Sequence, residues 1–89
     1  MSREKHYKIL FSRTAQKDYK SIKDAKLLKR INTILDDLQT NPFMGKPLQG
    51  EFEGLRSVKT FSFRLIYEID KNILTITVLK IQHRKESYR

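Results

Sequence analysis

The residues of this chain that could do chemistry lie at its C-terminal end and in one preceding segment. His83, Arg84 and Tyr88 stand within the last seven positions, "HRKESYR", and Arg64 lies in "FRLIYEID". Guanidinium groups stay protonated and bind phosphate oxygens through paired hydrogen bonds. An imidazole exchanges protons near neutral pH, whereas a phenol, with an unperturbed pKa of about 10, acts as a base only beside cations that lower it. Together these groups could hold a phosphodiester and move protons on it.

Cleavage of RNA by its own 2′-hydroxyl group needs what these side chains supply. A base must take the 2′ proton, an acid must protonate the 5′-oxygen, and cations must surround the charged phosphorane. The reaction needs no metal, and the chain offers no metal cluster, since it has no cysteine and its two histidines, His6 and His83, lie far apart in sequence. Tyr88 could transfer a proton or stack on an RNA base, so the base and the acid stay open.

The charge of the chain favours a polyanionic partner. Nineteen Lys and Arg against ten Asp and Glu give a net charge of +9, which steers a protein toward nucleic acid. We expect further phosphate contacts from Lys46, Arg56, Lys59, Lys80 and Lys85. Plainer interpretations compete with this one: a basic surface that keeps the protein soluble, an Arg64 that pairs with Glu68, and a His83 exposed at a strand end.

Length and composition predict one small domain, residues 1–89, located in the cytoplasm. The N-terminal "MSREKHYK" is charged and lacks the apolar stretch of a signal peptide. No apolar run approaches the roughly 20 residues of a membrane span. The absence of cysteine excludes disulfides, thiolate metal sites and thiol nucleophiles together.

The first half of the chain predicts a strand and two helices. The alternation in "HYKILFS" (6–12) indicates a short strand, and Ser12 can cap a helix from Arg13 to about Ile22. Asp24 can cap a second helix, which Asn41-Pro42 ends. The apolar positions of this second helix follow the i, i+3/i+4 spacing of one buried face: Leu27, Leu28, Ile31, Ile34, Leu35 and Leu38.

The second half predicts an irregular loop and three strands. Residues 42–54 hold both prolines and all three glycines, which is typical of a loop. Alternating and β-branched residues then indicate strands at 55–60, 63–70 and 73–81, with a turn at Asp70-Lys71-Asn72. The order β-α-α-β-β-β predicts an α+β fold, in which an N-terminal helical hairpin packs on one face of a mainly antiparallel sheet.

The open face of that sheet is where we expect the site. Pairing about a turn at 70–72 would set residue numbers that add to about 142 or 143 opposite each other, so 59–64 would lie beside 79–84. Ser57, Lys59 and Arg64 alternate with apolar residues and should share the open face. We therefore expect Arg64, Lys59, His83, Arg84 and Tyr88 to converge on one patch.

These segments resemble the RelE/ParE superfamily of bacterial and archaeal toxins. The resemblance rests on "FRLIYEID", followed after a turn and an apolar strand by "HRKESY", and on "GKPLQGEFEGLRSVKTFSFRLIY". It covers nearly the whole chain, most specifically 45–88, and implies a RelE-like fold. Arg64 matches the phosphate-contacting arginine of RelE-like nucleases, while His83, Arg84 and Tyr88 match residues of the family's C-terminal motif. YoeB-type members have a glutamate after the "GKP" loop, and "KPLQG" has none there.

The resemblance implies a toxin of a type II toxin–antitoxin system. RelE-type members are ribosome-dependent mRNA endonucleases that need no metal or other cofactor, and they inhibit translation and arrest growth. ParE-type members instead poison DNA gyrase without nuclease activity. Both types are neutralised by a cognate antitoxin, which would form a hetero-oligomer with this chain. The residues favour the RelE-type function, with the gyrase poison and a plain nucleic-acid-binding module as alternatives.

Overall fold

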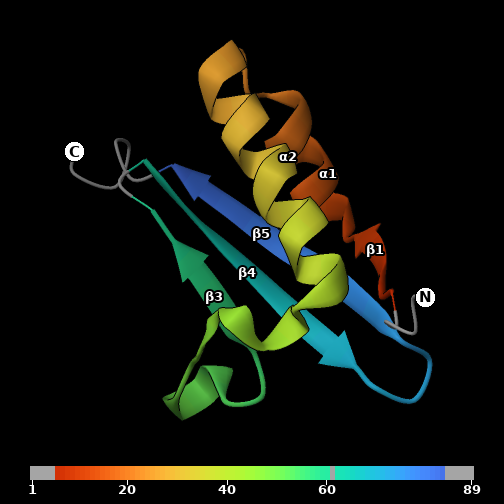
Figure 1. Cartoon of the computed structure of the whole chain (residues 1–89). Coiled ribbons are helices and arrows are strands. Elements are labelled where there is room, and N and C mark those ends of the chain that lie inside the picture. The colour runs from red at the N-terminus through yellow and green to blue at the C-terminus, as the bar shows by residue number, and fades with distance from the viewer. Residues whose placement is uncertain (1–5, 61, 84–89) are drawn as a thin grey trace.

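The computed structural model describes residues 6–60 and 62–83, which form a five-stranded sheet with two helices on one face (Figure 1). The elements are β1 (Lys8–Phe11), α1 (Arg13–Lys20), α2 (Ala25–Thr40), η1 (Pro42–Met44), β2 (Lys46–Pro47), η2 (Gly50–Phe52), β3 (Arg56–Lys59), β4 (Phe63–Asp70) and β5 (Thr75–His83). The strand order is β1-β5-β4-β3-β2, in which β1 and β5 run parallel and the other neighbouring strands run antiparallel. The predicted α+β class and element order are confirmed, with the two-residue strand β2 as an addition.

Both predicted helix caps are present. The Ser12 hydroxyl accepts a hydrogen bond of 3.1 Å from the Ala15 N–H, and the Asp24 carboxylate accepts from the N–H groups of Lys26 and Leu27. Helix α1 ends at Lys20, two residues before the predicted end, because the chain tightens into i→i+3 bonds after it. No helix in the described part of the chain is long and apolar enough to span a membrane.

The core lies between the two helices and the sheet. Four of the six predicted apolar positions of α2 are buried in this core, while Leu28 and Leu35 are partly buried and pack against it. The sheet contributes alternate residues of β4, together with Ile76, Val78 and Ile81 of β5, and the other face of these strands stays open. The buried apolar residues are Tyr7, Ala15, Ile22, Leu27, Ile31, Ile34, Leu38, Phe63, Leu65, Tyr67, Ile76, Val78 and Ile81.

The pairing of β4 with β5 differs from the predicted register. Phe63 lies opposite His83, whereas a turn at 70–72 would have put residue 79 or 80 there. The turn takes residues 71–74, with Leu74 in the left-handed region at φ 51°, so β5 begins later and extends further than expected. The predicted register was therefore wrong by about three positions, although the end of β5 still lies beside the start of β4.

The loop that was expected to be irregular is held by the buried Tyr67. Its hydroxyl donates to the Pro42 carbonyl (2.7 Å) and accepts from the Gly45 N–H (3.0 Å). A Cβ atom at Gly45 would lie 2.6 Å from the Tyr67 hydroxyl and 2.8 Å from the Ser57 carbonyl oxygen. This close approach brings the next two residues into pairing with β3, and it is why β2 exists.

We expect Gly45→Ala to destabilise the fold by about 1–3 kcal/mol, because the added methyl group overpacks the contact with Tyr67 and β3. Chemical denaturation of the variant measures this loss. In a Tyr67→Phe background the same substitution should cost less, since the hydroxyl it meets is gone. An equal loss of unfolding free energy in both backgrounds would contradict the close approach of Gly45 to the Tyr67 hydroxyl.

Candidate nucleic-acid interface

Side chains on the open face of the sheet form rows across the strands, because directly paired residues point to the same side. One row places Lys59, Arg64 and Gln82 side by side. The next row contains Lys46, Ser57, Ile66 and Lys80. Further along β4 the same face has two acids, Glu68 and Asp70. The open face is therefore basic toward the C-terminal end of β5 and acidic toward the other end.

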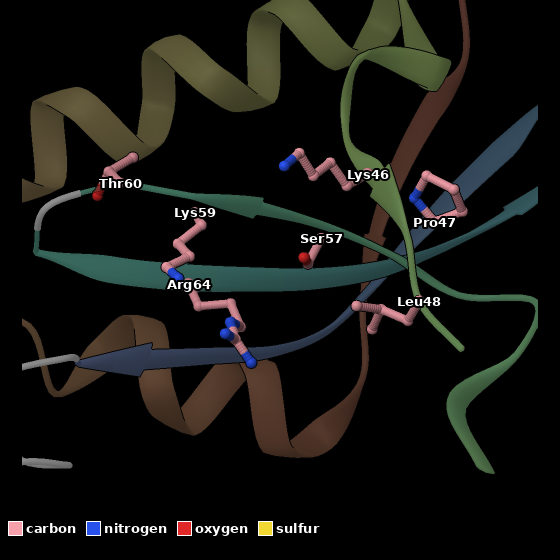
Figure 2. Close-up of a pocket in the computed structure, with 7 residues that line it drawn as sticks. All are labelled: Lys46, Pro47, Leu48, Ser57, Lys59, Thr60 and Arg64. Atoms are coloured by element: carbon pink, nitrogen blue, oxygen red, sulfur yellow. The ribbon is translucent and has the colours of Figure 1, made fainter. Parts of the chain in front are cut away.

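The basic rows enclose a hollow of about 630 Å³ (Figure 2). Figure 2 shows Lys59 and Arg64 extending from neighbouring strands, with Lys46 on β2, the strand that pairs with β3. The described lining holds three cations and no carboxylate, and its members are Lys46, Pro47, Leu48, Ser57, Lys59, Thr60 and Arg64. Such a hollow fits an anionic group.

The most informative pair in the hollow is Lys59 opposite Arg64. Like charges directly opposite each other on two strands are destabilising. The turn between β3 and β4 nevertheless holds them there: the Thr60 hydroxyl accepts from the N–H groups of Ser62 and Phe63, and the Thr60 N–H donates to the Phe63 carbonyl at 2.8 Å. A bound phosphate would offset the repulsion between the two cations.

Arg56 lies outside this hollow, although the sequence suggested it as a phosphate contact. It pairs with Tyr67, whose side chain is in the core, so it belongs to the covered face. Its guanidinium donates to the carbonyls of Gly45 (3.1 Å) and Phe43 (3.4 Å) and lies over the Phe43 ring. The alternation that places Ser57 on the open face already indicated this assignment.

His83 is also separated from Arg64 by the register. Its partner Phe63 is fully buried, so the pairing assigns the partly buried imidazole to the covered face, while Gln82 lies opposite Arg64. The expected convergence of His83 with Arg64 on one face is therefore absent from the structure. Lys80 does lie on the open face, one row from Arg64.

Three predicted site residues, Arg84, Lys85 and Tyr88, lie outside the described residues. Within residues 6–60 and 62–83, no three His, Cys, Asp or Glu side chains are placed to hold a metal ion. Sequence reasoning did not single out Asp18, whose carboxylate accepts a 2.9 Å hydrogen bond from the Ile81 N–H. Its position in the last turn of a helix, where acids are disfavoured, was the available signal.

The layered fold and its basic hollow define a small α+β domain with a cationic hollow on the open face of its sheet. The family described as the ParE toxin of type II toxin–antitoxin systems matches residues 9–88. The toxin RelG of Mycobacterium tuberculosis is 32% identical over 84 residues, which span 93% of this chain and 97% of RelG. The toxin RelE of the same organism is 29% identical, with 100% of this chain and 93% of RelE covered.

Solved structures agree with this assignment. The crystal structure of the toxin–antitoxin complex RelBE2 from Mycobacterium tuberculosis contains a chain that superposes with a TM-score of 0.80 at 31% identity. The match covers 89% of this chain and 99% of that one. The chain belongs to the RelE/ParE superfamily and is a toxin of the type II toxin–antitoxin class.

Proposed function

We propose that this toxin is a ribosome-dependent endoribonuclease that cuts mRNA by activating the RNA's own 2′-hydroxyl group. The observation that carries the proposal is the Lys59–Arg64 pair in a hollow whose described lining has no carboxylate. A structural role would not favour two cations directly opposite each other, whereas a phosphodiester needs them. The relatives named RelE and RelG support a RelE-type function for this chain.

In this proposal the hollow supplies charge rather than proton transfer. Arg64 holds the scissile phosphate through its guanidinium, and Lys59 and Lys46 add positive charge around the phosphorane. The described lining contains no imidazole and no carboxylate, and the proposal gives its lysines an electrostatic role, so the base and the acid are drawn from other residues. Because the register assigns His83 to the covered face, we propose Tyr88 for proton transfer, with Arg84 as a second guanidinium at the phosphate.

The proposed partners are the ribosome with its mRNA, and a cognate antitoxin. A chain of +9 net charge suits a ribosomal environment rich in phosphates. The solved RelBE2 neighbour is a toxin–antitoxin complex, which supports an antitoxin partner and a hetero-oligomer for this chain. The site of action is then the cytoplasm, and the outcome is inhibited translation and growth arrest.

Mapping RNA 5′ ends after brief induction tests the proposal. The wild-type toxin should create new ends inside translated reading frames, because the ribosome presents the mRNA. An Arg84→Ala variant should create far fewer at equal protein level, since one of two guanidiniums at the phosphate is lost. Growth arrest without new mRNA ends would overturn the nuclease assignment.

One observation favours a second candidate function, that of a DNA gyrase poison. The family that matches the chain is described by the toxin ParE, which is of the gyrase type. A gyrase poison would accumulate DNA cleavage complexes that depend on gyrase and leave mRNA intact. The same induced cultures can be assayed for both products. DNA cleavage complexes without mRNA ends would transfer the assignment to that candidate.

A further inference from the structure

Strand β5 contains one extra residue relative to β4. Ile66 lies opposite Lys80 and Tyr67 lies opposite Val78, which leaves Leu79 without a partner on β4. This bulge lets Val78 and Ile81 both enter the core, although they are three positions apart. Without the extra residue, the alternation from Val78 would turn Lys80 into the core and Ile81 outward.

Side chains at the two ends of α1 hold the bulged part of β5. The pairing of β1 with β5 ends at Phe11 and Val78, and α1 lies along β5 beyond that point (Figure 1). There the Ser12 hydroxyl donates to the Leu79 carbonyl (3.0 Å), and the Asp18 carboxylate accepts from the Ile81 N–H (2.9 Å). The helix therefore satisfies backbone groups that no strand reaches.

The position of Asp18 is unfavourable for the helix itself. It stands in the last turn of α1, where the helix dipole disfavours a carboxylate and favours cations such as Lys17 and Lys20. The side chain is nevertheless partly buried and directed to the edge of β5. Its hydrogen bond to Ile81 gives this acid a role outside its own helix.

We propose that Asp18, assisted by Ser12, is a positioning residue that sets the register of the last residues of β5 against Arg64. With the bulge held, Lys80 and Gln82 lie on the open face with Arg64, and β5 ends at His83, one residue beyond the Arg64–Gln82 pair. If the bulge is lost, a one-residue slip moves these side chains to the other face. The consequence for catalysis rests on the proposed nuclease function, whereas the register itself does not.

The test compares Asp18→Ala with Asp18→Asn, which keeps a carbonyl acceptor. Alanine favours the helix, so Asp18→Ala should remain folded while the kcat of mRNA cleavage falls by about tenfold or more, with little change in KM. Asp18→Asn should restore kcat to within about threefold of the wild type, since the acceptor is retained. Asp36→Ala removes an exposed acid from α2 and should leave both constants unchanged.

A structural readout separates this inference from the proposed function. In the wild type, the Ile81 amide should exchange slowly with solvent, and nuclear Overhauser contacts should link Arg64 with Gln82 across the strands. Asp18→Ala should speed exchange at Ile81 by about tenfold or more and weaken these contacts. Unchanged exchange and contacts in Asp18→Ala would overturn the inference, whether or not the wild type cuts RNA. A wild type that cuts no RNA, with the expected exchange behaviour, would overturn only the proposed function.

Discussion

Replacement of Arg64 by alanine is expected to slow mRNA cleavage on the ribosome by roughly 10²–10³-fold. Losses of this size are typical when an enzyme loses one preorganised group that stabilises a charged transition state. The thermal midpoint should stay the same or rise, because the substitution relieves the repulsion with Lys59 across β3 and β4. Single-turnover cleavage on programmed ribosomes measures the first effect, and thermal unfolding measures the second. Lower activity with unchanged or higher stability indicates an arginine that binds phosphate, whereas loss of a structural arginine would lower the stability as well.

Two variants control this result. Arg64→Lys keeps the charge but loses the paired hydrogen bonds, so its rate should lie between the wild type and Arg64→Ala. Glu68→Gln changes an exposed charge on the same strand and the same face, beyond the basic rows, and should cut at close to the wild-type rate. Cleavage by Arg64→Ala at the wild-type rate would remove Arg64 from the proposed mechanism.

The largest expected effect on stability comes from Tyr67→Phe. The substitution leaves the Pro42 carbonyl and the Gly45 N–H without their buried partner, which should cost roughly 2–4 kcal/mol for the two groups together. Urea denaturation at neutral pH measures the loss. Tyr19→Phe is the matched control, since its hydroxyl donates to Asn32 at the surface and its removal should cost less.

The stabilisation that the buried Tyr67 hydroxyl gives the fold should decrease at high pH. Burial raises the pKa of Tyr67 above its ordinary value of 10.0, so the unfolded chain loses this proton before the folded protein does. The stabilisation is therefore complete below pH 10 and falls as the pH rises above it. The difference in unfolding free energy between wild type and Tyr67→Phe should shrink from pH 9 to pH 11. If this difference in unfolding free energy stayed constant from pH 9 to pH 11, it would contradict the conclusion that the Tyr67 phenol is buried and neutral in the folded protein.

Local signals in the sequence were sufficient for the helices and for the class of fold. The caps at Ser12 and Asp24 and the apolar stripe of α2 depend on interactions within a few residues, which a sequence displays directly. The β-branched content of 73–81 correctly indicated a central strand, since β5 lies between β1 and β4.

The register of the hairpin could not be predicted, because it depends on the turn and on contacts from a distant helix. The turn ends at Leu74, which adopts a left-handed conformation that its residue type does not suggest. The bulge at Leu79 is held by Ser12 and Asp18, more than 60 positions away in sequence. Strand β2 likewise exists because the Tyr67 hydroxyl reaches Pro42 and Gly45.

Candidate site residues could be predicted from the sequence where the alternation of side chains along a strand decides which face of the sheet they are on. Arg64, Lys59 and Ser57 share the open face as expected, and Lys46 and Lys80 join them there. Alternation would also have assigned Arg56 correctly to the covered face. His83 could not be assigned without the true register, because each one-residue shift moves it to the other face.

Cleavage by purified toxin on programmed ribosomes, with analysis of the new RNA ends, tests the central claim most directly. Attack by the 2′-hydroxyl group predicts a 5′-hydroxyl end on the downstream fragment and a cyclic or 3′-phosphate on the upstream fragment. Cleavage should require the ribosome and should be reduced by roughly 10²–10³-fold in Arg64→Ala. Intact mRNA, or fragments with 5′-phosphate ends, would contradict the proposed mechanism.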